Sequence, residues 1–346
     1  MKAFRRTFLL FFFFFFSEVS LNAQENLHYS VHKIWDNGSY SSFTSLIQFK
    51  GNYYCSFREG EGHVFDENGK AEGRIRILSS KNGHSWKSVF LYHEEGTDLR
   101  DPKLSITPDG KLMISVGASI YRNRELVAQY PYVCFSPDGA HFGKLIKAQL
   151  EEQADHCNDW IWRLTWQGHI GYGVDYFQKN DGSRGLWLMT TTDGIQYQKH
   201  CELQIPDFPN ESTIRFLPDG RMAIMVRRDG GDCMGYWGLS APPFTNWTWK
   251  KMEFRLGGQD FLVTNDRDII VCSRSYYIPS ACKTTLFKGD ALTGKFHEVC
   301  VLPSGGDTSY PGLLIVGKQL WVSYYSGHET KRPAIYLAKV PLSLFK

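Results

Sequence analysis

The sequence predicts an all-β fold, a six-bladed β-propeller of four-stranded antiparallel blades. Three observations support this prediction. A short apolar strand, a tight turn and a second apolar strand recur six times, about 50 residues apart. Each turn carries the Gly, Asn or Asp that hairpins need for positive φ, and each flank is rich in β-branched and aromatic residues. No long helical periodicity interrupts the series.

The six copies follow one another along most of the chain. They are Ser45–Phe57, Lys103–Gly117, Arg163–Tyr176, Thr213–Arg228, Phe261–Arg274 and Gly312–Tyr325. A hairpin cannot bury both faces alone, and repeated hairpins fit blades packed around an axis. We expect intervening segments, such as Arg74–Leu78 and Leu186–Thr190, to supply the outer strands. A β-sandwich or two unrelated β domains are the alternatives, and the even spacing favours the propeller.

The N-terminus has the pattern of a targeting segment. A positively charged start is followed by the apolar run Phe8–Phe16 and by a small residue, Ala23. This run is much shorter than the ~20 residues that span a bilayer. We therefore expect a signal peptide at residues 1–23, one domain over residues 24–346, and a secreted or periplasmic protein without a membrane span after cleavage. An uncleaved anchor is the alternative.

Charge and cysteine spacing limit the classes of ligand. The formal net charge is only +3, which argues against a nucleic-acid partner because such a protein needs a concentrated basic surface. The eight cysteines form no C-x-x-C pair, so their spacing does not indicate zinc. We expect neither a metal nor an organic cofactor.

A second motif repeats more weakly. The segment SSKNGHSW (Ser79–Trp86) has relatives in SPDGAHF (Ser136–Phe142) and TTDGIQY (Thr191–Tyr197). These segments resemble the Asp-box of sialidases and some other propellers, although the first copy departs from it at Lys81 and Asn82. An Asx side chain caps such a turn and glycine takes positive φ. The motif is therefore structural and does not itself indicate catalysis.

Residues at matching distances from the turns converge on one rim of the predicted axis. Three arginines lie seven residues after a turn, two carboxylates lie nine residues before one, and a tyrosine falls at nearly the same place. They are Arg58, Arg227, Arg274, Asp101, Glu211 and Tyr310. Asp175 shares the arginine position in the third copy, where it could contact a sugar hydroxyl or pair with an arginine.

This combination of residue types has a chemical meaning. Guanidinium groups bind a carboxylate through paired hydrogen bonds and stay charged at any working pH. A tyrosine beside a glutamate can act as a nucleophile, because the glutamate takes the phenol proton. Tyrosine suits an anionic sugar, since an attacking carboxylate would be repelled by the substrate's own carboxylate. Taken singly, each arginine could be a solvated rim charge, and Tyr310 could be core packing.

The motifs that carry these residues resemble those of sialidase-like propellers, a group that includes bacterial exo-α-sialidases. The relevant segments are FREGEGH (Phe57–His63), DLRDPKLS (Asp98–Ser105), PNESTIRFLPDGRM (Pro209–Met222), MVRRDGG (Met225–Gly231) and GGDTSYPGLL (Gly305–Leu314). The resemblance implies that Tyr310 is the nucleophile and Glu211 its base. It also implies that Arg227 and Arg274 hold the substrate carboxylate.

The first blade departs from the sialidase pattern. Sialidases place an arginine where this chain has Ser42-Phe43-Thr44, and we expect Arg58 to fill that place. No residue of the first-blade loop aligns with the sialidase acid/base. The candidates are His63, Asp66 and Asp101, of which we favour Asp101, with His63 retained as a substrate-binding residue. The substrate could therefore be a related ulosonic acid.

These observations predict a secreted, exo-acting and retaining glycoside hydrolase for a glycan with a terminal acidic sugar. One alternative is a non-catalytic sugar-binding propeller that kept the carboxylate site. Another is a glycosidase for a neutral or uronic sugar, because Arg-Asp-Pro at Arg100–Pro102 resembles a motif of five-bladed glycosidases.

Overall fold

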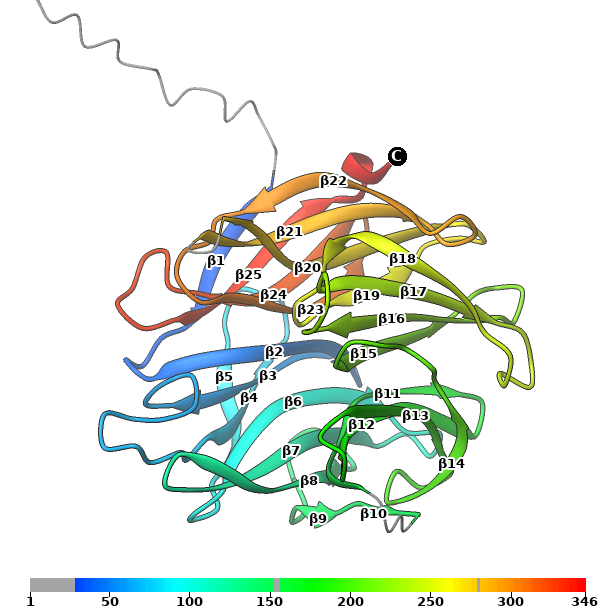
Figure 1. Ribbon diagram of the computed structural model, residues 1–346. Coiled ribbons are helices and arrows are strands. Elements are labelled where there is room, and N and C mark those ends of the chain that lie inside the picture. Colours follow the sequence, from blue (N-terminus) through cyan, green and yellow to red (C-terminus); the bar gives the residue numbers. More distant parts are fainter. Residues whose placement is uncertain (1–28, 152–155, 279–280) are drawn as a thin grey trace, which may run out of the picture.

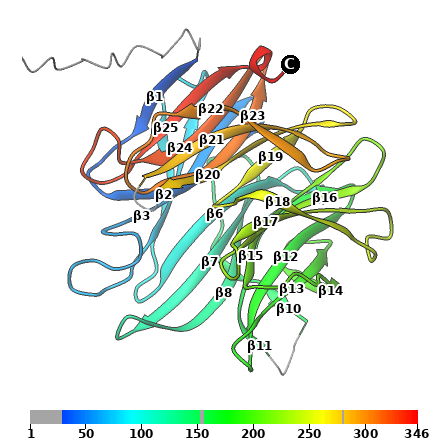
Figure 2. The same cartoon turned by 45° about the horizontal axis from the view of Figure 1, so that its top comes forward.

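The computed structural model describes residues 29–151, 156–278 and 281–346. It confirms the predicted all-β architecture, with six sheets arranged as the blades of a propeller. Figures 1 and 2 show the blades following one another around the middle of the molecule in chain order. The predicted signal peptide at residues 1–23 lies outside the described residues.

The strands of each blade run in sequence from the centre outwards. Blade 1 comprises β2 (Tyr40–Phe49), β3 (Asn52–Gly60), β4 (Arg74–Ser80) and β5 (Lys87–Tyr92). Blade 2 comprises β6 (Asp98–Ile106), β7 (Leu112–Arg122), β8 (Glu125–Ser136) and β9 (Ile146–Lys147). Blade 3 comprises β11 (His156–Gln167), β12 (Ile170–Lys179), β13 (Arg184–Thr191) and β14 (Gln196–Glu202), and β10 (Gln149–Leu150) adds a parallel fifth strand.

The remaining blades repeat this order. Blade 4 comprises β15 (Pro209–Phe216), β16 (Met222–Arg228), β17 (Met234–Ser240) and β18 (Thr248–Arg255). Blade 5 comprises β19 (Asp260–Val263), β20 (Asp268–Ile278), β21 (Ala281–Asp290) and β22 (Lys295–Leu302). Blade 6 comprises β23 (Thr308–Val316), β24 (Gln319–Ser326), β25 (Ala334–Pro341) and β1 (Ser30–Trp35), and the 3₁₀ turn η1 (Leu342–Phe345) follows it.

The ring is closed by the N-terminal strand. β1 pairs antiparallel with β25, so the outermost strand of the last blade comes from the start of the described chain. This closure ties two distant parts of the chain together in one sheet, and it leaves no blade short of a strand.

The inner strands are buried on both faces because each blade packs between two neighbours. In β16, Ala223 and Met225 belong to a core shared with blade 5, whereas Met222 and Ile224 belong to a core shared with blade 3. Alternate side chains of a strand point to opposite faces. This explains why the predicted hairpins are apolar in long runs.

The turns with the repeated Ser/Thr-x-Asx-Gly pattern lie between the third and fourth strands of blades 1 to 3. In each, the first hydroxyl accepts a hydrogen bond from the glycine N–H, at 2.8–2.9 Å. The Asx oxygen accepts from the N–H two residues further on, at 2.7–2.9 Å. Asn82 of the first copy thus does what Asp138 and Asp193 do.

Five of the six inner strands carry a β-bulge at the same height, blade 5 has the matching feature just before β19, and this arrangement positions the site. In β23 the pairing passes from Ser309↔Tyr325 to Gly312↔Ser323, so two residues oppose one. The same shift occurs in the other inner strands, with blade 5 defined by the backbone hydrogen bond from Arg274 to Gly257. The bulged pairs are Phe43–Thr44, Asp101–Pro102, Trp162–Arg163, Asn210–Glu211, Gly258–Gln259 and Tyr310–Pro311. Bulges re-aim side chains, and here several are re-aimed towards the axis.

No helix in the described part of the chain is long and apolar enough to cross a membrane. Each of the eight cysteines is free of a disulfide bond.

Candidate functional site

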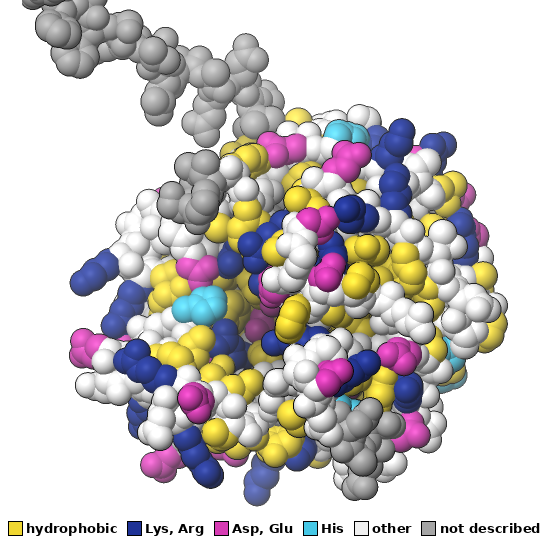
Figure 3. Space-filling view, in the orientation of Figure 1, with side chains coloured by type: hydrophobic (Ala, Val, Ile, Leu, Met, Phe, Trp, Pro, Cys, Tyr) yellow, Lys and Arg dark blue, Asp and Glu magenta, His cyan; other side chains and the backbone are white. Residues whose placement is uncertain are grey.

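The bulges bring Tyr310, Glu211 and Asp101 together from three different blades. Tyr310 and Asp101 both take a left-handed φ of 48°, which is uncommon for residues other than glycine. All three side chains are buried, with at most 7% of each residue exposed. Strained backbone that holds polar groups at the centre of a fold is typical of functional sites. Figure 3 shows acidic and basic side chains gathered near the middle of this face.

Tyr310, Glu211 and Arg227 form a closed triangle. The Tyr310 hydroxyl donates to Glu211 Oε1 at 2.6 Å. Arg227 Nη1 lies 2.9 Å from both the Tyr310 hydroxyl and Glu211 Oε2. The arginine therefore stabilises negative charge on either partner, and the carboxylate is placed to accept the phenol proton.

The charges of this triangle fix the resting protonation state. Burial acts to raise the pKa of Glu211, but Arg227 and the hydrogen bond from Tyr310 outweigh it, so the net pKa lies below the ordinary value. Burial holds the pKa of Tyr310 well above its usual value, although Arg227 and Arg274 oppose this shift. Glu211 is thus an ionised base beside a neutral phenol.

A glycine of blade 5 allows Tyr310 to occupy this place. Gly258 has a φ of +59°, and a Cβ built on it would lie 2.2 Å from the Tyr310 ring. Its N–H also donates to Glu211 Oε2 at 3.0 Å. Only glycine combines this backbone conformation with so close an approach.

Arg274 lies on the other side of the tyrosine. Its guanidinium lies 5.2 Å from the centre of the Tyr310 ring, and its Nη2 contacts Asp307 Oδ1 at 2.6 Å and the Tyr325 hydroxyl at 2.7 Å. Asp307 Oδ2 contacts His63 Nδ1 at 2.6 Å and also accepts from the Tyr40 hydroxyl. This network leads from the buried tyrosine out to the surface, because 46% of the His63 side chain is exposed.

Asp101 lies beside a buried lysine. Lys103 Nζ is 3.6 Å from Asp101 Oδ1, donates to the Thr44 carbonyl and lies 5.8 Å from the centre of the Tyr310 ring. Asp101 Oδ1 is buried without a hydrogen-bond partner among the described residues. Burial raises the pKa of Asp101, and it lowers the pKa of Lys103 to about 8. Asp101 is therefore suited to hold a proton.

The place of the missing first-blade arginine is filled by a phenyl ring. Phe43 packs 4.9 Å from the Tyr310 ring and 5.2 Å from the His63 ring, measured between centroids. The guanidinium of Arg100, from the next blade, lies 5.0 Å above Phe43. A cation thus reaches this side of the site from a neighbouring blade.

Arg58 does not join the cluster, which corrects the sequence-based expectation. It is fully buried and pairs with Asp98 at 2.7 Å, and it also donates to the carbonyl oxygens of Gly62 and Val64. The first-blade loop therefore covers its guanidinium. The position of Arg58 was misjudged because the turns from which it was counted differ in length. The turn before β3 joins the paired residues Phe49 and Asn52, whereas the turn before β16 joins Phe216 and Met222 and is longer.

Asp175 also lies apart from the cluster, so the structure does not bring it to Tyr310 and Glu211. It is 1% exposed and sits inside blade 3, where its Oδ1 accepts from the Trp160 N–H at 2.9 Å. Asp66, the remaining acid candidate, caps its own loop by accepting from the N–H groups of Asn68 and Lys70.

Sequence reasoning missed several residues of the site. They are Tyr40, Phe43, Arg100, Lys103, Gly258, Asp307 and Tyr325. Asp307 had a detectable signal, because it precedes Tyr310 by three residues just as Asp98 precedes Asp101. The others become visible only when the bulges are known.

No known protein family and no curated protein matches the sequence. Solved structures match its fold at low identity. A Dyadobacter fermentans protein of unknown function has a TM-score of 0.75 at 17% identity, covering 90% of this chain and 99% of that one. Trypanosoma rangeli sialidase bound to the inhibitor DANA has a TM-score of 0.72 at 10% identity, covering 90% of this chain and 59% of that one.

A third similar structure is a Fusarium graminearum α-L-arabinofuranosidase in complex with arabinobiose. It has a TM-score of 0.64 at 14% identity and covers 90% of this chain and 96% of that one. These chains share the fold with this protein. Both the sialidase and the arabinofuranosidase are glycoside hydrolases, and the chain spans about 59% of the sialidase's length.

Proposed function

We propose that this chain is an exo-acting glycoside hydrolase that removes a terminal acidic sugar from a glycan, with Tyr310 as its nucleophile. The observation that carries the proposal is the 2.6 Å hydrogen bond from Tyr310 to Glu211, with Arg227 contacting both. Such a pair can form a covalent glycosyl intermediate without presenting a carboxylate to an anionic sugar. The cations around it, Arg227, Arg274 and Arg100, supply the means to hold a substrate carboxylate.

The reaction follows from the protonation states. Tyr310 attacks the anomeric carbon and its proton passes to Glu211, while the glycosidic bond breaks and the leaving oxygen takes a proton from Asp101. Water then attacks the tyrosyl-linked carbon, giving its proton to Asp101, and Glu211 returns a proton to Tyr310. Two displacements at one carbon retain the configuration.

Asp101 is the acid in this proposal because it is buried, its Oδ1 has no hydrogen-bond partner among the described residues, and its pKa is raised. His63, held by Asp307 at the exposed end of the network, is the rival donor. The two differ in what they predict for leaving groups. Loss of the true acid slows substrates with poor leaving groups far more than activated aryl substrates.

The experiment is hydrolysis of an aryl α-sialoside by the parent, by Tyr310→Phe and by Tyr132→Phe. Tyr132 is a matched control because it lies on β8, away from the site. We expect Tyr310→Phe to lower kcat at least about 1000-fold and Tyr132→Phe to retain the parent rate. Parent-like activity in Tyr310→Phe would exclude the tyrosine nucleophile.

A neutral sugar is the second candidate, and one observation favours it. Carboxylates already neutralise the two central arginines, since Arg227 contacts Glu211 and Asp229, and Arg274 contacts Asp307. An aryl α-L-arabinofuranoside assayed beside the sialoside separates the candidates. Hydrolysis of the furanoside but not of the sialoside would mean that the substrate is a neutral sugar. Tight binding of either compound without hydrolysis would indicate a sugar-binding protein.

A further inference from the structure

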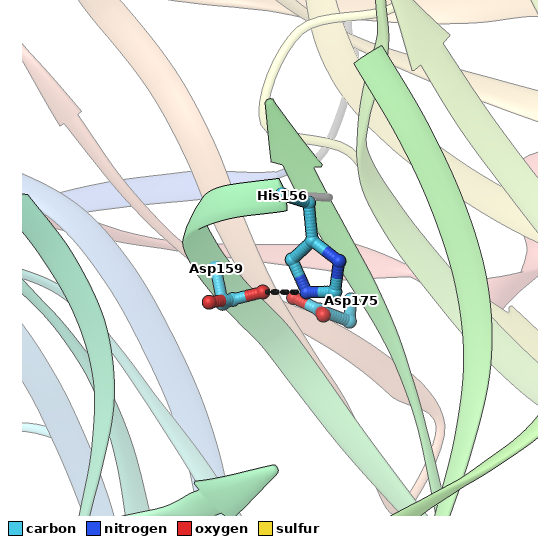
Figure 4. Close-up of side chains that lie close together, drawn as sticks. All are labelled: His156, Asp159 and Asp175. Atoms are coloured by element: carbon cyan, nitrogen blue, oxygen red, sulfur yellow. Dashed lines mark ion pairs between the residues drawn. The ribbon is translucent and has the colours of Figure 1, made fainter. Parts of the chain in front are cut away.

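A second cluster of titratable side chains lies in blade 3, apart from the Tyr310–Glu211 pair. It consists of His156 and Asp159 on β11 and Asp175 on β12 (Figure 4). His156 Nε2 lies 2.9 Å from Asp159 Oδ1. One ligand atom from each of the three residues lies within 4.8 Å of the other two. Three groups of this kind at such distances are the first requirement for a metal site.

The backbone is shaped to bring these groups together. The pairing of β11 and β12 shifts between Cys157↔Gln178 and Trp160↔Tyr176, so Asn158 and Asp159 form a second bulge in β11. Asn158 takes a φ of 61° at this bulge. The bulge turns Asp159 towards Asp175, and Figure 4 shows both carboxylates at the edge of the His156 ring.

The imidazole is held in place by packing. The centroid of the His156 ring lies 4.2 Å from that of Phe177 and 4.7 Å from that of Trp187. Only 5% of the histidine side chain is exposed. Its orientation is therefore fixed before any ligand binds, which lowers the entropic cost of binding.

Asp159 pairs with His156, whereas Asp175 has no ion-pair partner among the described residues. Asp175 is 1% exposed, and its Oδ1 accepts from the Trp160 N–H. Its Oδ2 is buried and has no hydrogen-bond partner among the described residues. A proton or a metal ion must separate the two carboxylates.

We propose that His156, Asp159 and Asp175 bind one divalent transition-metal ion of the zinc or manganese type. An imidazole nitrogen with two carboxylate oxygens is a suitable donor set for such ions, and the nitrogen disfavours calcium and magnesium. Ligand atoms about 2.0–2.2 Å from an ion lie at most about 4.4 Å apart, so the cluster needs only a slight contraction. A shared proton would join the two carboxylates, whereas an ion would also be bound by the imidazole nitrogen.

The ion would stabilise the part of blade 3 that lies beside the central site. It would join the beginning of β11 to β12 beside Trp160, whose ring stacks on Tyr176 and packs where Gly117 of blade 2 lacks a side chain. The inference does not depend on the proposed hydrolase activity. It concerns the stability of blade 3, so its test needs no substrate.

The test is metal binding by the full chain, purified without a polyhistidine tag and stripped with a chelator. Calorimetry with Zn²⁺ or Mn²⁺ alone should give one ion per chain, and an excess of about 100-fold over Kd should raise Tm by several degrees. Asp175→Asn should weaken binding more than about 100-fold. It should also raise the Tm of the metal-free chain, because it removes the repulsion between the carboxylates.

The matched control is Asp181→Asn, in an exposed turn of the same blade, where the carboxylate contacts only Ser183 among the described residues. It should bind the ion as the parent does. If Asp175→Asn does not fold, Asp159→Asn takes its place. Absence of binding and of a Tm change in the parent up to millimolar metal would overturn the proposal in favour of a shared proton. Undiminished binding by both asparagine variants would overturn it as well.

Discussion

The same interblade ion pair occurs twice in the ring, with opposite surroundings. Arg58 of blade 1 reaches Asp98 of blade 2, and Arg274 of blade 5 reaches Asp307 of blade 6. Each aspartate lies three residues before a bulged residue, Asp101 or Tyr310. The first pair has no exposed side-chain surface, whereas 12% of Arg274 and 23% of Asp307 are exposed.

The difference is made by the first-blade loop. Carbonyl oxygens of Gly62 and Val64 accept from Arg58, and Gly73 leaves no room for a side chain beside it. Among the described residues, the Arg274 guanidinium donates to one backbone carbonyl, that of Thr308, and it lies over the Tyr310 ring. Strand position therefore decides where an arginine is placed, and loop packing decides whether it can meet a ligand.

The largest expected effect is the loss of stability on breaking the fully buried Arg58–Asp98 pair. Arg58→Ala leaves Asp98 buried with Arg100 as its one remaining ion-pair partner among the described residues, so we expect the free energy of unfolding to fall by about 3–5 kcal/mol. Urea denaturation measures this change. In the proposed reaction, the folded variant should keep the parent KM within about threefold. A KM raised tenfold or more would mean that Arg58 contacts substrate after all.

At the partly exposed Arg274–Asp307 pair, we expect a substitution to affect catalysis more than stability. We expect Arg274→Ala to lower kcat/KM about 100- to 1000-fold, since it removes a cation beside the reacting tyrosine. Its cost in unfolding free energy should be smaller than that of Arg58→Ala, because water can solvate Asp307. Steady-state kinetics and urea denaturation of both variants make the comparison. Equal losses of unfolding free energy in the two variants would contradict the distinction between the buried Arg58–Asp98 pair and the partly exposed Arg274–Asp307 pair.

The placement of Tyr310 can be tested through its neighbour. Gly258→Ala would push the ring aside, and displacements of about 1 Å can cost 100-fold in rate, so we expect kcat to fall about 10- to 100-fold. Gly317→Ala is the matched control, with a φ of +59° and open space around it. A similar rate loss in both variants would point to backbone strain rather than to the position of the tyrosine.

The pH profile should report the two carboxylates. The pKa of Glu211 is lowered, so activity is lost only when pH falls through that low value and the base becomes protonated. The pKa of Asp101 is raised, so activity declines as pH rises through it and the acid loses its proton. Asp101→Asn should abolish the alkaline decline and slow alkyl sialosides far more than aryl ones. The same pattern in His63→Ala instead would assign the acid to His63.

Much of the fold was predictable because its signals are local. Turn residues and apolar runs mark each inner hairpin, and the structure confirms all six. The closing strand Ser30–Trp35 was not predictable, because none of its residues is fully buried and its partner β25 lies about 300 residues away. No local sequence pattern predicts such a pairing.

The site was predictable only in part, for a physical reason. Tyr310, Glu211, Arg227 and Arg274 meet at the centre, as the spacing predicted. Bulges shift each inner strand by one residue, however, and a shift of one residue turns a side chain to the other face. The turns also differ in length, and the one before β3 is shorter than the one before β16, so counting from the turns put Arg58 in register with Arg227, although its structural counterpart is Arg274.

Covalent trapping tests the central claim most directly. The protein would be incubated with a 2,3-difluorinated acidic sugar, which forms its glycosyl–enzyme link faster than it hydrolyses, and then digested for peptide mass spectrometry. We predict one added sugar on the peptide that contains Tyr310, and none in Tyr310→Phe. A sugar attached to Glu211, or turnover of an aryl sialoside without any trapped tyrosine, would contradict the account.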